Sequence, residues 1–234
     1  MSNPVQAWQP VKAPVATTMT GRFIRLEKLN PLVHSEDLWQ ALQGTESDLK
    51  LWDYLPYGPF YERESFDTWL DGYAISNDPL GFCVVDLETG HAQGILSLMS
   101  IVRVHGRMEL GHLAFSAAMQ RTPKGTEAVY LAAKLAFSQG YRRLEWKCDA
   151  ANERSKRAAL RFGFSPEGVF RQHMIVKSRN RDTAWFSILD KEWPVIEKAF
   201  EGWLSEENQA PGGQVKTLEA LRSEITRPVE VAAV

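Results

Sequence analysis

The chain has 234 residues, of which 44% are hydrophobic and 24% are charged, and this composition is typical of one globular domain with elaborations or of two small ones. The formal net charge of −2 at pH 7 argues against a surface built as a whole for nucleic acid or an anionic membrane. With two isolated cysteines, no apolar signal segment and no run of 18 apolar residues, we expect a cytoplasmic protein without a disulfide framework, zinc cluster or membrane span.

The first half of the chain is predicted to form two helices and an antiparallel meander. An irregular N-terminal arm over residues 1–20 contains three prolines and shows no periodicity, and the first strand follows around Ile24. Apolar residues at helical spacing predict one helix capped by Ser35 and another over 62–77. Three strand-like runs joined by short turns come next, at 82–88, 94–104 and 108–116.

The second half alternates helices with strands. Helices are predicted over 125–139, 152–162 and 191–204, and strands over 142–148, 168–177 and 183–190, with the polar turn SRNRD between the last two strands. This order implies parallel pairing on one side of a mixed sheet. We therefore expect an α/β (α+β) fold over 21–204, with a mostly antiparallel central sheet flanked by helices. Residues 205–234 are expected to form a linker and an accessory tail, with a short detached helix over 214–226.

Positive charge is concentrated between residues 142 and 181, where eleven Lys or Arg residues stand against four acids. This asymmetry indicates an anionic ligand on that half of the chain. A solvated helix face would explain about half of the same charges, so both interpretations stay open.

The strand that ends near Phe115 passes through a polar loop directly into a helix. Backbone N–H groups at such a helix start have no partner within the helix, and the helix dipole adds positive potential, so the junction suits a phosphate. Arg121 and Lys124 add positive charge, while Gly125 lets the oxygens of a ligand approach the main chain. An ordinary capped helix start is the alternative interpretation of this loop taken alone.

Three motifs together resemble the Gcn5-related N-acetyltransferase (GNAT) superfamily, and within it the Rim-type acetyltransferases of ribosomal-protein N-termini, over roughly residues 21–204. Gln120-Arg-Thr-Pro-Lys-Gly125 is similar to the loop that holds the acetyl-CoA pyrophosphate, with Pro123 in place of the first glycine. The segment 148–164 resembles the later motif, in which an Asn and an N-x-x-S helix start lie beside the pantetheine arm and the sulfur. Glu109-Leu-Gly is similar to the E-[IL]-G pattern on the strand that splays from its parallel neighbour.

The resemblance implies a set of residues that bind acetyl-CoA and two that are catalytic. The main chain of Phe115 to Ala117 would pair with the pantetheine amides. The expected cofactor-binding residues are Phe115, Ser116, Ala117, Gln120, Arg121, Thr122, Lys124, Gly125, Thr126, Asn152 and Lys156. Ser155 is the expected proton donor to the CoA sulfur and Glu109 the expected base. A helix-surface role for Ser155, a solvent-facing role for Glu109, and His112 as the base remain open alternatives.

The loop from Leu51 to Phe60 and the helix after it occupy the region of the chain that, in related enzymes, covers the acceptor side. The expected substrate-binding residues are Trp52, Asp53, Tyr54 and Tyr57, with Asp53 attracting a cationic amine. Core packing is the alternative for this loop and is favoured for Trp52. Cys148 competes as a nucleophile, although packing in the sheet is the commoner role for such a cysteine.

The resemblance therefore implies an acyltransferase that uses acetyl-CoA as co-substrate and no metal, and that acetylates a primary amine by direct attack in a ternary complex. At neutral pH an α-amine is roughly a tenth neutral and a lysine amine far less, so a weakly placed base favours a peptide N-terminus or a similarly acidic small amine. A non-catalytic acyl-CoA-binding or sensor module is the alternative function. We expect neither a membrane nor a nucleic-acid partner, and a homodimer stays open.

Overall fold

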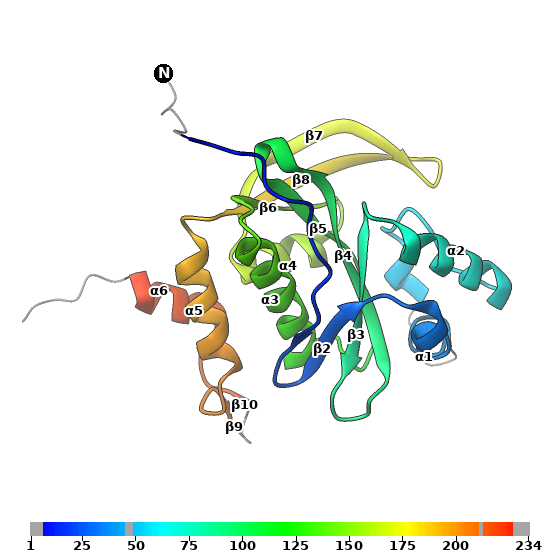
Figure 1. Cartoon of the computed structure of the whole chain (residues 1–234), viewed down its shortest axis with the longest axis horizontal. Helices are drawn as coiled ribbons and strands as arrows, with labels where there is room; N and C mark the ends of the chain where they lie inside the picture. Colours follow the sequence, from blue (N-terminus) through cyan, green and yellow to red (C-terminus); the bar gives the residue numbers. More distant parts are fainter. Residues whose placement is uncertain (1–6, 45–48, 211–212, 227–234) are drawn as a thin grey trace, which may run out of the picture.

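The computed structural model describes residues 7–44, 49–210 and 213–226, and its centre is one mixed sheet of eight strands (Figure 1). The strands lie in the order β1-β2-β3-β4-β5-β6-β8-β7, and β5 and β6 form the parallel pair. Their bounds are β1 Met19–Thr20, β2 Ile24–Lys28, β3 Leu80–Asp86, β4 Ala92–Val102, β5 Arg107–Phe115, β6 Arg143–Asp149, β7 Ser165–Val176 and β8 Arg179–Leu189. A separate two-stranded ribbon joins β9 Gln209–Ala210 to β10 Gly213–Gln214.

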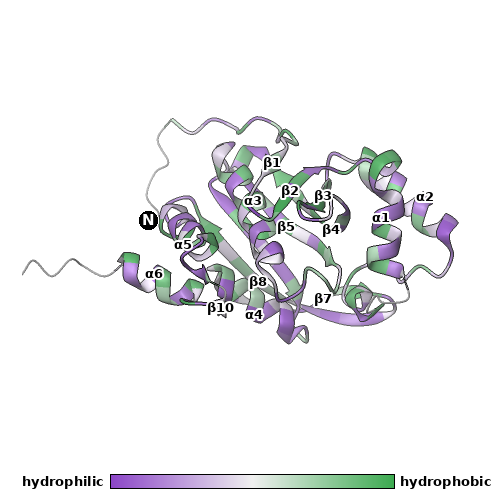
Figure 2. Cartoon of the chain, turned by 90° about the horizontal axis from the view of Figure 1, so that it is seen from below, coloured by the Kyte–Doolittle hydropathy of each residue, from purple (hydrophilic) through white to green (hydrophobic). Residues whose placement is uncertain are grey.

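Helices cover both faces of this sheet, and the view in Figure 2 sets α1 and α2 on one side of the strands and α3 and α5 on the other. The α-helices are α1 Pro31–Gln43, α2 Arg63–Ile75, α3 Pro123–Ser138, α4 Glu153–Phe162, α5 Trp193–Leu204 and α6 Leu218–Thr226, and two short 3₁₀ turns, η1 Leu49–Trp52 and η2 Arg103–His105, complete the set. The expected mixed, mostly antiparallel sheet with flanking helices is therefore confirmed.

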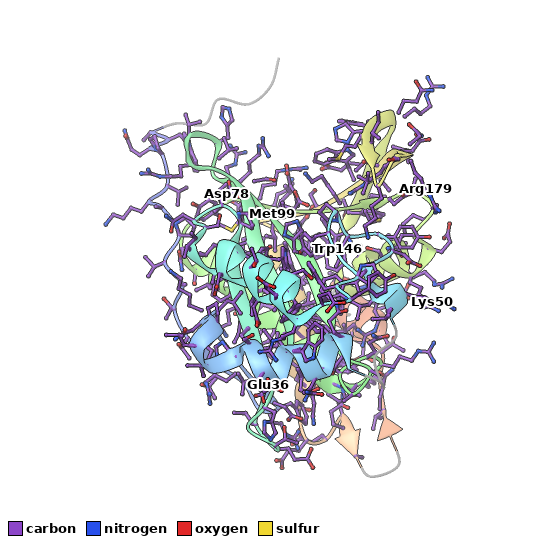
Figure 3. All side chains as sticks on the ribbon, turned by 90° about the vertical axis from the view of Figure 1, so that its right-hand side faces the viewer. Glu36, Lys50, Asp78, Met99, Trp146 and Arg179 are labelled. Atoms are coloured by element: carbon purple, nitrogen blue, oxygen red, sulfur yellow. The ribbon has the colours of Figure 1, made fainter. Side chains whose placement is uncertain are left out.

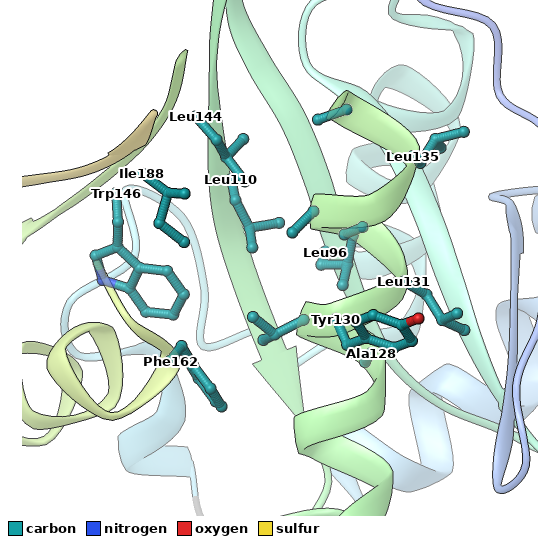
Figure 4. Close-up of a cluster of buried hydrophobic side chains, with 14 of the residues drawn as sticks. Leu96, Leu110, Ala128, Tyr130, Leu131, Leu135, Leu144, Trp146, Phe162 and Ile188 are labelled. Carbon is teal, nitrogen blue, oxygen red and sulfur yellow. The ribbon is translucent and has the colours of Figure 1, made fainter. Parts of the chain in front are cut away.

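Two hydrophobic cores hold these layers together. The larger core lies between the sheet and α3, α4 and α5, where Leu131 and Leu135 of α3 face Leu96 and Leu110 of the sheet (Figure 4). The smaller core lies under α1 and α2 and includes Trp52, which is fully buried. Burying one such large apolar side chain contributes roughly 1.5–3 kcal/mol, so the two cores fix the position of the strands between them.

Two predicted boundaries are wrong for identifiable reasons. Asn30, not Ser35, caps α1: its side chain accepts a hydrogen bond from Leu32 N, because Pro31 already occupies the first helical position. The turn between β7 and β8 consists of two residues, Lys177 and Ser178, both with positive φ, instead of the five-residue SRNRD segment. Neither is the glycine or asparagine that usually marks such a turn.

The segments outside the predicted domain also pack against it. In the N-terminal arm, Val11 N donates to Arg103 O and Trp8 Nε1 donates to Val104 O, so this segment crosses the end of the meander. The predicted short helix near the C-terminus is present as α6, but it is not detached, since Leu218 is 1% exposed and belongs to the larger core. Residues 1–6 of the arm and 227–234 of the tail lie outside the described residues.

Candidate active site

The strands β5 and β6 pair only at their beginnings. Their parallel register runs from Arg107 opposite Arg143 to Glu109 opposite Glu145, although β5 continues to Phe115. The sheet therefore opens between the second halves of these two strands. On its other side, β5 carries one residue more than β4 between Gly111 and Ala114, and His112 within this bulge has a φ of 55°. Such bulges re-aim side chains and leave main-chain groups unpaired, so an extended ligand can add to the open edge.

The loop after β5 leads to a helix start that no side chain caps. Thr122 is the N-cap residue of α3, but its hydroxyl donates to Met119 O at 2.8 Å instead of accepting from the first turn. Pro123 takes the first helical position, where its missing N–H would have had no partner in the helix. The helix thus begins two residues before the predicted start at Gly125. The N–H groups of its first turn are left for an anion.

The two basic residues of this loop stand in different environments. Arg121 is exposed and makes no ion pair in the described part of the chain. Lys124 is held by carboxylates at the end of β3 and beyond it, with Nζ 2.7 Å from Asp86 and 3.1 Å from Glu88. The hydrogen bond to Asp86 raises the pKa of Lys124, so this cation is already neutralised within the protein.

The other residues of the predicted cradle also have partners of their own. Gln120 Nε2 donates to Phe115 O at 2.9 Å, and Ser116 N donates to Gln93 O at 2.9 Å, so two of the expected pairing groups are used within the loop. Ala117 is exposed, and Thr126 Oγ1 accepts from Arg161 Nη1 at 3.0 Å. A Cβ added to Gly125 would lie 3.1 Å from Met119 O, which explains the need for glycine at this close approach.

The start of α4 lies on the opposite side of the opening. Asn152 caps this helix as expected, with its side chain accepting from Ser155 N at 3.0 Å. Ser155 Oγ accepts from the indole Nε1 of Trp146 at 2.9 Å, and a hydrogen bond of Ser155 with the Cys148 thiol opposes the rise that burial causes in the pKa of that thiol. Lys156 forms an ion pair with Glu153 at 2.6 Å within the same turn.

Glu109 is one of two carboxylates at the point where β5 and β6 separate; the other, Glu145, forms ion pairs with Arg107 and Arg143. Glu109 is 4% exposed, and its Oε2 lies 2.6 Å from Lys147 Nζ and accepts from Ser100 Oγ at 3.1 Å. The other oxygen, Oε1, faces Gly111 and makes no hydrogen bond in the described part of the chain. Burial raises the pKa of Glu109, while the charge of Lys147 opposes this rise. The residue is thus buried instead of solvent-facing.

His112 connects β5 to an aromatic cluster under the acceptor loop. Its Nδ1 lies 3.1 Å from Tyr73 Oη, and its ring centroid is 5.3 Å from that of Tyr57. Burial, assisted by the positive charges of Lys147 and Arg181, lowers the pKa of His112 to about 4. The imidazole is therefore neutral at physiological pH. Tyr73 and Lys147 were not predicted as site residues, because their contacts with β5 come from helix packing and sheet register instead of sequence proximity.

The acceptor loop divides into a buried and an exposed part. Trp52 is fully buried, which agrees with core packing and removes its side chain from any substrate surface. Burial raises the pKa of Tyr57, whose ring packs against Trp52, whereas Tyr54 is 42% exposed and Asp53 is exposed. Lys177 Nζ, from the β7–β8 turn, donates to Trp52 O at 2.8 Å. Figure 3 shows Arg179 of this hairpin and Lys50 of η1 on the same side of the molecule.

Two further observations limit the chemistry of this site. Burial raises the pKa of the Cys148 thiol, which disfavours the nucleophilic thiolate and agrees with the packing interpretation. Within the described ranges, no three His, Cys, Asp or Glu side chains are grouped as metal ligands would be.

Across the same residues, no helix has the length and apolar character needed to cross a membrane.

Comparison with known proteins assigns the family. The acetyltransferase (GNAT) domain model matches residues 25–165. A GCN5-related N-acetyltransferase structure from Brucella melitensis is 42% identical, with a TM-score of 0.89 and coverage of 94% of this chain and 100% of that one. A GNAT-family acetyltransferase structure from Chromobacterium violaceum is 39% identical, with a TM-score of 0.76 and coverage of 83% and 96%.

A more distant structure shares the fold. The Microcin C7 self-immunity acetyltransferase MccE, solved in complex with acetyl-CoA and AMP, is 19% identical, with a TM-score of 0.63 and coverage of 72% of this chain and 93% of that one. Among curated proteins, none matches this sequence. The family model and the two structures near 40% identity show that the chain belongs to the GNAT family of N-acetyltransferases, enzymes that take an acetyl group from acetyl-CoA.

Proposed function

We propose that this enzyme acetylates a primary amine, either the α-amine of a protein N-terminus, as in the Rim-type branch, or the amine of a small molecule. The amine attacks acetyl-CoA directly while both are bound. The observation that carries this proposal is the opening between β5 and β6 with the buried carboxylate of Glu109 at its apex.

The residues around the opening fit acetyl-CoA. The uncapped first turn of α3 offers N–H groups to a pyrophosphate, and Arg121 adds an unpaired cation beside it. Lys124 would join them only by leaving Asp86, so we assign it a smaller share of the affinity. The open edge of β5 suits the pantetheine amides, and Asn152 lies at the helix start on the other side. When bound, acetyl-CoA supplies the thioester whose carbonyl carbon the amine attacks.

Glu109 is better placed than His112 to receive the proton of the amine. Its Oε1 is free, whereas Nδ1 of His112 lies against Tyr73, a hydroxyl whose pKa burial raises and which therefore keeps its proton. In either tautomer Nδ1 of His112 is occupied by the Tyr73 hydroxyl, which leaves only Nε2 to face an acceptor. Glu109 accepts the proton directly or through one water.

Ser155 completes the proton balance at the leaving group. The amine nitrogen forms a bond to the carbonyl carbon, the carbon–sulfur bond breaks, and the sulfur takes a proton. Because Ser155 Oγ accepts from Trp146, its hydroxyl hydrogen is oriented away from the indole, and to protonate the cofactor sulfur it would turn from the Cys148 thiol to that sulfur. The raised pKa of Cys148 disfavours an acyl-enzyme route through that thiol.

The test is release of the free CoA thiol from acetyl-CoA with N-terminal peptides, lysine peptides and small amines. We expect turnover with α-amines at neutral pH, since about a tenth of an α-amine with a pKa near 8 is neutral there. Binding of acetyl-CoA without turnover on any amine would establish the non-catalytic binding module instead.

A further inference from the structure

One strand of the site carries buried polar groups that have no hydrogen-bond partner among the residues that the structure describes. Four buried polar side-chain atoms in the described part of the chain lack a hydrogen-bond partner, and two of them, Arg181 Nε and Trp185 Nε1, belong to β8. Both residues lie on the face of the sheet that carries Lys147. Trp185 of β8 pairs with Lys147 of β6, and Arg181 is four residues before Trp185, so the alternation of side chains along the strand places it on the same face. A buried donor without an acceptor costs about 1–3 kcal/mol, so such groups indicate a missing partner.

Arg181 also differs from the other cations of this face in having no acid beside it. Lys147 is paired with Glu109, and Arg143 is paired with Glu145 and Glu167. Arg181 forms no ion pair within the described residues. Its guanidinium is permanently charged, and it is carried by the part of β8 that extends past the end of β6 and pairs there with Met174 of β7.

The position of Arg181 relates it to the reacting atoms. It lies on β8 beyond Thr183, which pairs with Asp149 at the end of β6, where the opening between β5 and β6 is widest. Its positive charge lowers the pKa of His112 on one side of the opening, in the same direction as the larger effect of burial, and on the other side it opposes the rise that burial causes in the pKa of Cys148. A group bound to Arg181 would therefore lie close to the thioester.

We propose that Arg181 binds a carboxylate that the acceptor carries close to its reactive amine, so that the substrates are amines with a neighbouring acidic group. This inference rests on the proposed function and names the class of its acceptor. A carboxylate supplies both the acceptor that Nε lacks and the negative charge that the guanidinium lacks, often through two parallel hydrogen bonds. The acidic group is either the terminal carboxylate of a small molecule or the side chain of an acidic residue near a protein N-terminus.

Trp185 extends the same surface along β8 toward Lys147, whose Nζ lies 4.8 Å from the centroid of the Trp185 ring. It is four residues from Arg181 along β8, or about 13 Å of extended strand, and it lines a pocket of about 390 Å³ with Glu167 and Phe170. Its free indole N–H is thus available to a carbonyl further along the acceptor. The exposed Asp53, expected to attract the amine, lies in the loop contacted by the β7–β8 turn.

The experiment compares matched pairs of acceptors that differ only in one carboxylate. Dipeptides with a free C-terminus are compared with their C-terminal amides, and amidated hexapeptides with Glu at the second position are compared with those with Gln. We expect the acidic member of at least one pair to have a roughly tenfold or larger kcat/KM, since a charge-assisted hydrogen bond is involved. The pair that responds identifies the source of the carboxylate.

Two variants assign the preference to this residue. Arg181→Gln should reduce kcat/KM for the acidic acceptor about tenfold, leave its neutral partner within twofold, and leave acetyl-CoA affinity unchanged. Arg181→Lys keeps the charge but loses Nε, so it should retain part of the preference for the acidic acceptor. It replaces Arg181→Gln in the comparison if the Gln variant does not fold. Arg179→Gln, an exposed arginine on the same strand, is the matched control and should keep the wild-type preference.

Three results would overturn the inference. Equal kcat/KM for the acidic and neutral members of both pairs in the wild type would remove the carboxylate from recognition. An equal loss for both members in Arg181→Gln would show a structural role, and weaker acetyl-CoA binding would assign Arg181 to the cofactor. Each of these requires measurable turnover, whereas absence of turnover with every amine contradicts the proposed function itself.

Discussion

The two sides of the opening between β5 and β6 are assembled in different ways. On the cofactor side, residues close together in sequence shape the two helix starts: Thr122 hydrogen-bonds Met119, and Asn152 caps the helix that carries Ser155. The acceptor side joins distant segments, since Tyr73 meets His112 39 residues away and Lys177 meets Trp52 125 residues away. Loop and hairpin residues on the acceptor side can therefore change without disturbing the helix starts that face acetyl-CoA.

This difference separates the expected effects of mutation. Changes on the cofactor side, apart from those at Ser155 beside the leaving group, should appear in the affinity for acetyl-CoA, because local helix starts present the binding groups. Changes on the acceptor side should appear in turnover, acceptor choice or pH dependence, because packing between distant elements positions those groups. Variants from both sides, measured for both properties, test whether the division holds.

The largest effect is expected for Glu109→Gln. This change keeps the shape of the side chain but removes the proton acceptor, so kcat should fall by about 10²–10³-fold while the affinity for acetyl-CoA stays the same. Steady-state kinetics and equilibrium binding measure the two quantities. Ser100→Ala, which removes a hydrogen bond to Oε2 but leaves the carboxylate, is the control and should stay within a few-fold of wild type. Retained turnover in Glu109→Gln would remove Glu109 as the base.

The second-largest effect is expected in the free energy of unfolding, which should depend on pH because of the lowered pKa of His112. Its pKa is about 4 in the folded protein, whereas the ordinary histidine value of 6.5 applies to the unfolded chain, which therefore binds more protons between these pH values. The free energy of unfolding should fall as the pH drops from 6.5 to 4, by about 3 kcal/mol in total from this residue. Denaturant titrations across this range should show a shallower fall for His112→Gln. Parallel curves for variant and wild type would contradict the neutral, buried imidazole.

Much of the fold and of the cofactor side could be predicted because their signals are local. Apolar spacing located the helices and strands, and Asn152 followed by Ser155 marked a helix start that the structure confirms as an N-cap. Pro123 stands where the family loop has a glycine, and it lacks the N–H that a glycine would offer to a phosphate. It nevertheless occupies the first position of α3, where proline is well suited. That position depends on where the helix begins, and the sequence predicted the start two residues too late.

The acceptor side could not be predicted because its determinants are tertiary. Lys147 meets Glu109 only once β5 and β6 are placed in register, and Arg181 belongs to the site only because β8 extends through the segment predicted as a turn. The wrong turn placement came from Lys177 and Ser178, which adopt positive φ without the usual glycine or asparagine. Trp52 was among the expected substrate-binding residues, but its complete burial confirms the core packing that was favoured for it.

A smaller effect should separate the two basic residues of the phosphate loop. Arg121→Glu places an acid beside the first turn of α3 and should weaken acetyl-CoA binding about thirtyfold, since a charge-assisted contact is replaced by repulsion. Lys124→Gln should weaken it only a few-fold, because Lys124 is already paired with Asp86. Titration calorimetry with acetyl-CoA measures both. A larger loss at Lys124 than at Arg121 would mean that Lys124 leaves its carboxylates to meet the cofactor.

The smallest effect is expected for Ser155→Ala, about a tenfold decrease in kcat, because a thiolate leaves readily even without a donor. The same change leaves the Trp146 indole N–H without its acceptor, at a cost of about 1 kcal/mol in stability, so lower turnover could have a structural origin. Trp146→Phe separates the two causes, since it removes the indole donor and keeps the serine hydroxyl. Near wild-type turnover in Trp146→Phe together with a loss in Ser155→Ala assigns the proton to Ser155, whereas equal losses would make the pair a packing element of the cofactor side.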